Sequence, residues 1–420
     1  MRKQVLAALL LASAASGVVY AQTSTQTTAP ARPGKPQLGD FGVDLTAMDR
    51  SIAPGDDFYN YVNGAWMART QIPADRASWG GFAILRNLSD ERTRAVIEGA
   101  AAAPGSDPVA TKIGDTYATF MDAAAIESAG AAPLKPYLAK IAAINSQSDL
   151  AKAFGEATKH GIDVPIGAGV QQDLKDNTVY AVYLGQGGLG LPDKDYYLKD
   201  DPKFAEARTK YVTYIADMMR MAGQPDPQGS AQRVYELEKA IAQQHWDRAE
   251  LRQVEKGYNP MPVAQLATAM PGFDWQAMLT EQGLGSQTRV IVGQPSALTG
   301  TAKIVAATPL STWKEYLAFH TISNAAPLLS SNFVNTQFAF YGTTLNGTPQ
   351  LKERWKRGVD LVNGSLGEAV GQIYVQKYFP PEAKAKADEL VRNLIAAMDI
   401  RLSKLTWMAP ETKVKARAKL

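Results

Sequence analysis

The amino-acid sequence predicts a mainly α-helical protein with two largely helical lobes and a few short strands. Long segments place apolar residues three and four positions apart, which is the spacing of one helix face. These segments span residues 107–122, 204–223, 230–251, 310–329, 351–379 and 381–407. Runs rich in Val, Ile and Tyr predict strands at residues 177–185 and 288–293.

The first residues have the features of a removable secretory leader. Arg2 and Lys3 give a positive start, residues 5–19 form an apolar run, and small or permissive residues lead to Ala21. This pattern predicts a signal peptide, residues 1–21, and an exported protein in the periplasm or outside the cell. The apolar run is shorter than the roughly 20 residues of a transmembrane helix, and no cysteine follows it for lipid attachment. We therefore expect no stable membrane anchor.

The segment after the leader is rich in Thr, Gln and Pro. Residues 22–40 have little to bury, so we expect a disordered linker there and ordered structure from Phe41 onward. Asp56 and Asp57 then precede a helical pattern. We interpret them as helix caps, which are much commoner at such positions than a metal or acid/base pair of carboxylates.

A change from long helical patterns to short elements marks residues 255–262, EKGYNPMP. It predicts a boundary between an N-terminal helical region, 41–257, and a second helical region, 258–420. The formal charge of +3 is small, and no basic stripe alternates with aromatic residues, so we expect no nucleic-acid partner. The sequence leaves the oligomeric state open.

One glycine-rich motif has the spacing of a dinucleotide-binding loop. Residues 185–190, GQGGLG, follow a predicted strand, but the fingerprint also needs a helix that begins directly afterwards. Here Pro192 and Pro202 interrupt the following segment, and the next helical pattern begins near Phe204. We therefore interpret the motif as a glycine-rich turn.

The residues that usually bind zinc or form a nucleophile are scarce. The histidines, His160, His245 and His320, lie in different helical segments, and no His-Glu-x-x-His pattern occurs. There is no cysteine and no Gly-x-Ser-x-Gly motif, although the composition does not exclude a Ser-His-Asp triad. By its own residues, the sequence shows no catalytic site and no metal-binding set.

The chain ends within a helical pattern. Residues 405–420 read LTWMAPETKVKARAKL, and Pro410 and Glu411 suit the first turn of a helix. Val414 and Leu420 contribute to a core face, but no glycine cap, proline stop or polar tail follows. We therefore expect the structure to be interrupted at this end of the chain.

Several segments, in order along the chain, are similar to the neprilysin-like zinc metallopeptidases, in particular to their bacterial secreted endopeptidase branch. The similar segments are DRSIAPGDDFYNYVNGAWMARTQIPADRASWGGFAILRN (49–87), LGLPDKDYYL (189–198), YNPM (258–261), FAFYGTTLNGTPQLKERWKRGVDLVNGSLGEAVGQIYV (338–375) and WMAPETKVKARAKL (407–420). The resemblance implies two mainly helical domains around a chamber that admits peptides and excludes large folded proteins.

In the complete family protein, the resemblance implies a Zn²⁺ ion held by two His and a Glu. The zinc polarises the scissile carbonyl and activates water, and the Glu of His-Glu-x-x-His is the general base. Those motifs belong to a later segment without a counterpart here. We therefore expect an N-terminal portion that lacks the zincin segment, has no catalytic residue and binds no metal by itself.

One substrate contact is implied by the resemblance. Neprilysin-type members have two arginines that flank a Tyr-Gly-x-Phe-x-Ile-Leu pattern and can bind a substrate's C-terminal carboxylate. In SWGGFAILR, Arg86 occupies one of these positions and Ser78 the other. The substitution by Ser78 favours endopeptidase action on short peptides over dipeptide release. The alternative interpretation of Arg86 is a surface salt bridge.

Two hypotheses from different functional classes follow. The first is an exported zinc-dependent metalloendopeptidase that hydrolyses short peptides, of which this chain is the N-terminal part. The second is a non-catalytic peptide-binding protein from a truncated gene. Continuing sequence with His-Glu-x-x-His would favour the first hypothesis, and a stably folded short product would favour the second.

Overall fold

The computed structural model describes residues 42–102, 105 and 107–420. The chain separates into two compact units, one that ends at Gln71 and one from Ile72 to Leu420. The predicted signal peptide, its cleavage site, the linker and the start of order at Phe41 lie outside the described residues. The division between the two predicted helical regions stays a prediction.

The first unit contains a 3₁₀ helix, η1 (Leu45–Ala47), and one α-helix, α1 (Phe58–Arg69). Asp57 is the N-cap of α1, and its carboxylate accepts a hydrogen bond from the backbone N–H of Asn60 at 2.9 Å. The predicted capping role is thus confirmed for Asp57. Such a cap satisfies one of the backbone donors that the first turn leaves without a helical partner.

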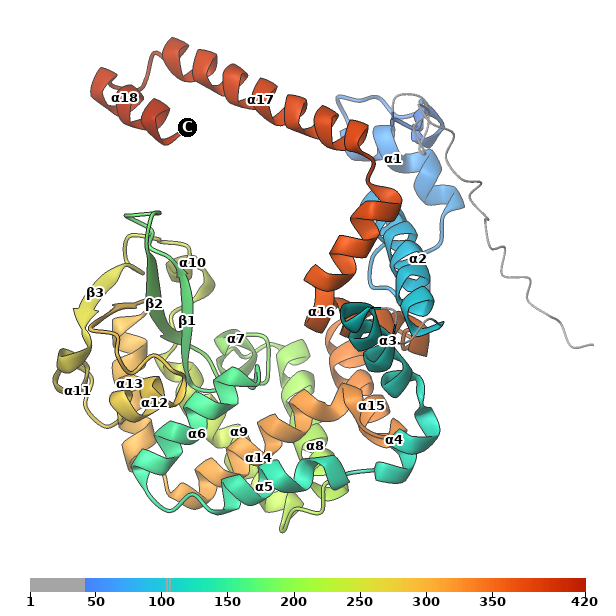
Figure 1. Ribbon diagram of the computed structural model, residues 1–420. Helices are drawn as coiled ribbons and strands as arrows, with labels where there is room; N and C mark the ends of the chain where they lie inside the picture. The colour runs from blue at the N-terminus through green and yellow to red at the C-terminus, as the bar shows by residue number, and fades with distance from the viewer. Residues whose placement is uncertain (1–41, 103–104, 106) are drawn as a thin grey trace, which may run out of the picture. The chain divides into compact units, whose positions relative to one another are not determined.

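The second unit is mainly α-helical, as predicted (Figure 1). Its α-helices are α2 (Gly81–Ala102), α3 (Pro108–Met121), α4 (Ala123–Ala129), α5 (Lys135–Ala142), α6 (Gln147–Lys159), α7 (Lys194–Leu198), α8 (Pro202–Met221), α9 (Pro227–Gln244), α10 (Arg248–Leu251), α11 (Leu266–Ala269), α12 (Trp275–Glu281), α13 (Pro295–Ala307), α14 (Leu310–Ala325), α15 (Ser331–Gln337), α16 (Arg354–Tyr378), α17 (Pro381–Lys404) and α18 (Pro410–Lys419). The 3₁₀ helices are η2 (Ala132–Leu134), η3 (Val263–Gln265) and η4 (Ala326–Leu328), and η5 (Phe338–Leu345) is a π-helix.

The long helical segments of the sequence analysis all contain helices, with internal breaks that the apolar spacing does not reveal. The segment 230–251 is divided between α9 and α10, because the chain is extended at His245. α16 has a kink at Leu366, where φ is −130° and ψ is 24°. At the end of the chain, α18 begins at Pro410 with Glu411 in its first turn, as the sequence predicted.

A single sheet of four strands lies among the described residues, in the order β1-β2-β4-β3. Its strands are β1 (Ile166–Gln172), β2 (Tyr180–Gln186), β3 (Asn259–Pro262) and β4 (Arg289–Val292). The two predicted strands are confirmed as β2 and β4, which form the parallel centre of the sheet. β1 and β3 pair antiparallel at its edges.

Neither edge strand is predicted from the sequence, and there is a physical reason for each. β1 is rich in Gly, Ala and Gln, which lack strand propensity, and β3 contains Pro260 and Pro262. Proline has no N–H to donate, so it is tolerated at a sheet edge where one side of the strand stays unpaired.

The larger hydrophobic core of the second unit extends from Leu134 to Phe340. Its centre is aromatic: Trp313 and Tyr316 of α14 are fully buried, and the Trp313 ring lies edge-on to Phe154 of α6 with 5.4 Å between centroids. The sheet packs beside this core, with α6 against β1 and α13 against β2 (Figure 1). This core fixes the loops and helix ends that surround the cavities described below.

A smaller core joins α2, α3 and α16. Val96 and Ile97 of α2, Ile113 of α3, and Val359 and Val362 of α16 are its most buried members. This core packs the C-terminal half of α2 against α16. It therefore positions the charged residues that lie on those two helices above the apolar contacts.

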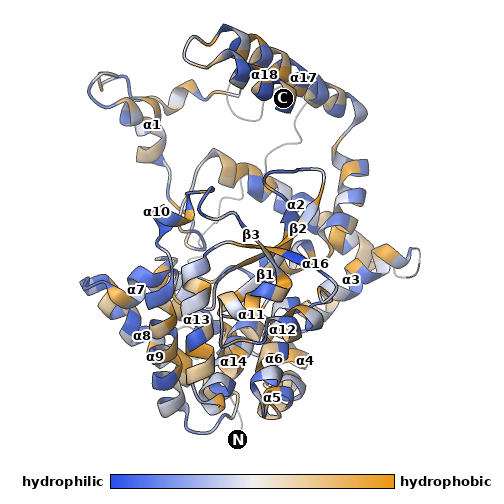
Figure 2. Cartoon of the chain, turned by 90° about the vertical axis from the view of Figure 1, so that its left-hand side faces the viewer, coloured by the Kyte–Doolittle hydropathy of each residue, from blue (hydrophilic) through white to orange (hydrophobic). Residues whose placement is uncertain are grey.

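α17 and α18 carry apolar residues that remain exposed. Figure 2 shows hydrophobic residues recurring along both helices. On α17 the exposed side chains include Leu390, Leu394 and Met398, at 61%, 61% and 49%, four positions apart on one face. None of the described helices combines the length and apolar character that a membrane crossing requires.

Candidate substrate-binding site

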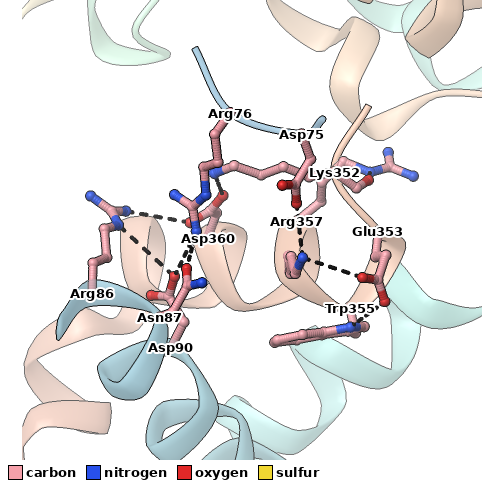
Figure 3. A network of polar contacts seen from close by, with 11 residues as sticks. Asp75, Arg76, Arg86, Asn87, Asp90, Lys352, Glu353, Trp355, Arg357 and Asp360 are labelled. Carbon is pink, nitrogen blue, oxygen red and sulfur yellow. Dashed lines mark hydrogen bonds and ion pairs between the residues drawn. The ribbon is translucent and has the colours of Figure 1, made fainter. Parts of the chain in front are cut away.

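The predicted substrate contact, Arg86, lies in the second turn of α2 and faces α16. Its guanidinium is 3.9 Å from the carboxylate of Asp90, one turn further along α2. Its other side is 3.6 Å from the carboxylate of Asp360 on α16 (Figure 3). Both contacts are long, and the Arg86 side chain is 63% exposed. The surface ion pair of the alternative interpretation is therefore present, and the guanidinium also remains accessible to a ligand.

The two carboxylates beside Arg86 each have a second cationic partner. Asp360 accepts a hydrogen bond from Nζ of Lys352 at 2.8 Å. Asp90 lies 3.8 Å from the guanidinium of Arg76, which also donates to the side-chain oxygen of Asn87 (Figure 3). Arg86 can thus turn toward a ligand without leaving a carboxylate unpaired.

Burial and charge affect the carboxylates of this network differently. Burial raises the pKa of Asp90 above its usual value, and the nearby Asp360 adds to that effect. Burial also raises the pKa of Asp75, but the hydrogen bond and charge of Lys356 outweigh it, so the pKa is lowered overall.

A second set of polar contacts lies at the N-terminal end of α16. Lys356 donates to Asp75 at 2.8 Å and lies 3.2 Å from Glu353. Glu353 in turn accepts a hydrogen bond from the indole N–H of Trp355 at 2.8 Å (Figure 3). These side chains are thus paired with one another beside the exposed guanidinium of Arg86.

The arrangement can bind an anion at the surface of α2. A guanidinium presents parallel N–H donors that match the two oxygens of a carboxylate. Ser78, at the second family position, is exposed and can contribute a single hydroxyl at most. The site therefore offers one charged anchor instead of two.

The charged partners of Arg86 are not among the residues predicted from the sequence. Asp90 is four residues after Arg86 on the same helix, so the i,i+4 rule for helix side chains could have identified it. Asp360 and Lys352 come from a distant part of the sequence, and no local pattern indicates that they face α2. Their placement depends on the small core that joins α2 with α16.

The three histidines lie apart from one another, and each has its own surroundings. His160, at the end of α6, is on the surface with Nε2 3.3 Å from Glu156. His245 follows α9 and is buried, and His320 of α14 is buried with Nε2 2.8 Å from Glu238. The described residues contain no group of three or more His, Cys, Asp or Glu side chains that could bind a metal ion.

Burial of His245 should make the stability of the fold depend on pH. Burial lowers its pKa from 6.5 to about 4, although a backbone hydrogen bond to Gly187 opposes the shift. Below pH 6.5 the unfolded chain gains a proton that the folded chain does not, so the free energy of unfolding decreases. Between pH 8 and 5 we expect a loss of about 2 kcal/mol from this residue.

Urea unfolding at several pH values measures this effect. His245→Asn should remove the pH dependence between 6.5 and 5, and His160→Asn, at an exposed histidine, should leave it unchanged. If the free energy of unfolding changed equally with pH in the His245→Asn variant and in the unchanged chain, His245 would not be the source of the pH dependence.

The glycine-rich motif forms the end of β2 and the loop that follows it, and no helix begins directly after it. β2 ends at Gln186, and the following α7 starts only at Lys194. Gly188 has a φ of 79°, which favours glycine. Gly190 lies so close to the hydroxyl of Tyr211 that a Cβ atom at this position would overlap it. The glycines thus allow the loop to pack on buried tyrosines.

A sequence profile described as Peptidase family M13 matches residues 54–420. The chain belongs to this family. Its fold is similar to the zinc metalloprotease ZMP1 of Mycobacterium tuberculosis in complex with an inhibitor. The TM-score is 0.83 at 39% identity, over 90% of this chain and 58% of ZMP1. The family expectation from the sequence is thereby confirmed.

Curated relatives in family M13 include mouse neprilysin, 28% identical over 89% of this chain and 53% of neprilysin. Mouse endothelin-converting enzyme-like 1 is 24% identical over 89% of this chain and 50% of that protein. The chain thus spans about half the length of the curated M13 relatives that it matches. Its described residues correspond to the N-terminal portion of a neprilysin-like zinc metallopeptidase.

Proposed function

We propose that this chain is the N-terminal part of an exported zinc-dependent metalloendopeptidase that hydrolyses short peptides. The match to family M13 over residues 54–420 carries the proposal, and the similarity to ZMP1, a zinc metalloprotease, supports it. The zinc ligands and the general base would come from sequence outside this chain. The leader pattern at residues 1–21 supports export to the periplasm or beyond the cell.

The exposed apolar face of α17 also supports an N-terminal part of a larger protein. Side chains at Leu390, Leu394 and Met398 are about half exposed or more. An apolar stripe on a helix normally packs against further polypeptide. In the proposal, the zinc-binding segment covers this face.

The protein isolated from its native source tests the proposal. We expect an intact mass well above the 45.3 kDa of this chain. We also expect cleavage of a quenched fluorescent peptide that stops with a chelator and returns with Zn²⁺. A native protein with the mass of this chain and no cleavage would overturn the peptidase and favour a peptide-binding protein.

Within this function, we propose that Arg86 binds the C-terminal carboxylate of the peptide. Arg86→Ala should lower kcat/KM about tenfold for a peptide with a free carboxylate, because a charge-assisted hydrogen bond contributes about 1.5–3 kcal/mol. The same peptide with a C-terminal carboxamide should be cleaved almost equally by both enzymes. Stability should change by less than about 1 kcal/mol, since the ion pairs of Arg86 are exposed.

Arg252→Ala is the matched control, because Arg252 is an exposed arginine outside the Arg86 network. It should leave the ratio between the free and amidated peptides unchanged. If Arg86→Ala reduced cleavage of both peptides equally, Arg86 would be a structural residue and not a carboxylate anchor.

A further inference from the structure

A polar cavity of about 300 Å³ lies in the second unit, apart from the Arg86 network. The loop after α6, the glycine-rich loop, α14, and the junction of α15 with the π-helix η5 surround it. Its polar lining includes Asp163, His320, Asn324, Gln337 and Tyr341. No lysine or arginine is among the lining residues. The ligand that the cavity can bind therefore depends on which hydrogen-bonding atoms of these side chains have no partner within the protein.

His320 forms the deepest polar group of this lining, at 6% exposure. Its Nε2 is 2.8 Å from the carboxylate of Glu238, which also accepts from the hydroxyls of Tyr197 at 2.6 Å and Tyr211 at 2.9 Å. Because these donors converge on one carboxylate, Nε2 carries the hydrogen. Nδ1, the other ring nitrogen, has no hydrogen-bond partner among the described residues.

The amide side chains of the lining are oriented by the backbone. Asn324 donates through Nδ2 to the carbonyl of Gly161 at 2.9 Å, and Gln337 donates through Nε2 to the carbonyl of Ser323 at 2.7 Å. These bonds use the amide nitrogens, so the side-chain oxygens remain as acceptors. The hydroxyl of Tyr341 donates to the carbonyl of Gly190 at 3.0 Å, so toward a ligand its oxygen can act only as an acceptor.

Asp163 supplies the charge of the cavity. It follows α6 as an exposed residue between the buried Ile162 and Val164, and within the described part of the chain its carboxylate has neither an ion pair nor a side-chain hydrogen bond. The lining therefore combines one free negative charge with several oxygen acceptors. A ligand that complements this set must be positively charged and must carry several N–H donors.

We propose that this cavity binds a guanidinium group, as the side chain of an arginine in a peptide. A guanidinium is planar, always charged and carries five N–H donors, so it can bond the carboxylate and the amide oxygens together. An ammonium group has three donors on a single atom and is more strongly hydrated. A divalent metal ion is less suited, because the lining has only one carboxylate.

The proposal extends the peptidase function by naming a class of preferred substrate, namely peptides that contain arginine. The preference for arginine-containing substrates rests on the proposed peptidase function. Binding of the guanidinium itself needs only the residues of this chain. Failure of peptide cleavage and failure of this site are therefore separate results.

Binding of N-acetyl-arginine amide to the 420-residue chain, measured by isothermal titration and by saturation-transfer NMR, tests the site. N-acetyl-citrulline amide has nearly the same shape without the charge and should bind at least about tenfold more weakly. N-acetyl-lysine amide should bind with intermediate affinity. Equal affinity for the arginine and citrulline compounds, or no binding of either, would overturn the proposal.

Asp163→Asn should weaken binding of the arginine compound about tenfold, because it removes the charge and keeps the shape. Asp200→Asn, at another exposed aspartate without an ion pair in the described structure, is the matched control and should bind normally. Asn324→Leu leaves the charge in place and should also weaken binding. Far-UV circular dichroism and thermal melts check that the variants are folded.

Two further results would contradict a guanidinium site. One is an equal effect of Asp163→Asn and Asp200→Asn on binding. The other is displacement of the arginine compound by stoichiometric amounts of calcium chloride, which would identify the cavity as a metal site.

Discussion

Replacing Glu238 by alanine should lower the free energy of unfolding by about 3–5 kcal/mol, as is usual when one member of a buried charged cluster is removed. Glu238 has no exposed surface and accepts hydrogen bonds from Tyr197, Tyr211 and His320. All three donors are themselves buried, so water cannot replace the lost acceptor without entering the core. Each orphaned donor then loses about 1–3 kcal/mol of hydration or hydrogen bonding.

The hydroxyls that surround Glu238 stay protonated over the useful pH range. Burial raises the pKa of Tyr197 and of Tyr211 well above their ordinary values, and the charge of Glu238 adds to the shift. Both phenols therefore remain donors wherever the protein is folded. The cluster consequently has one acceptor and several obligatory donors.

Urea unfolding followed by circular dichroism measures the effect. Glu236→Ala is the matched control, since Glu236 is an exposed glutamate two residues earlier on α9, and it should change stability by less than about 1 kcal/mol. Glu238→Gln keeps the shape and one acceptor oxygen, so its loss of stability should be smaller than that of Glu238→Ala. Similar values for Glu236→Ala and Glu238→Ala would show that the cluster does not stabilise the fold.

Gly190→Ala should destabilise the protein by about 3 kcal/mol, the upper part of the range for a group forced into a packed core. A Cβ atom on Gly190 would overlap the hydroxyl of Tyr211, which is fully buried. The Tyr211 ring has little room to move, because it lies 5.4 Å from Phe340 and 5.9 Å from Phe319 between ring centroids. Relief of the overlap would thus disturb both the aromatic core and the hydrogen bond to Glu238.

Gly169→Ala provides the control for this substitution. Gly169 lies in β1, where a Cβ atom would meet no neighbour within 4 Å. The variant should be as stable as the unchanged chain or slightly more stable, since alanine restricts the unfolded state. If Gly190→Ala and Gly169→Ala had the same midpoint in urea unfolding, the glycine-rich loop would be able to move away from Tyr211.

The two substitutions should also be coupled, because Gly190 and Glu238 act on the same tyrosine. The double variant should be less destabilised than the sum of the single effects predicts. Once Tyr211 has lost its acceptor, its hydroxyl can move away from the added methyl group at lower cost. Full additivity would indicate that the two contacts are independent.

The sequence by itself determined most of the helices and the family. Apolar spacing located the long helices because a helix buries one face, and Asp57 and Pro410 marked helix starts through local backbone chemistry. The central strands were also evident from their Val, Ile and Tyr content. The ordered series of motifs indicated family M13, which the profile match then showed.

Only the tertiary structure decided how the charged residues meet. Glu238 lies on the same helix face as the buried Val234 and Ile241, a local sign of an unusual buried carboxylate, but its partner His320 is 82 positions away. Arg86 likewise gained Asp360 through the packing of α2 on α16. Sequence periodicity reports which face of an element is buried. It carries no information on which distant element covers that face, and that pairing creates both the Arg86 network and the cavity at Asp163.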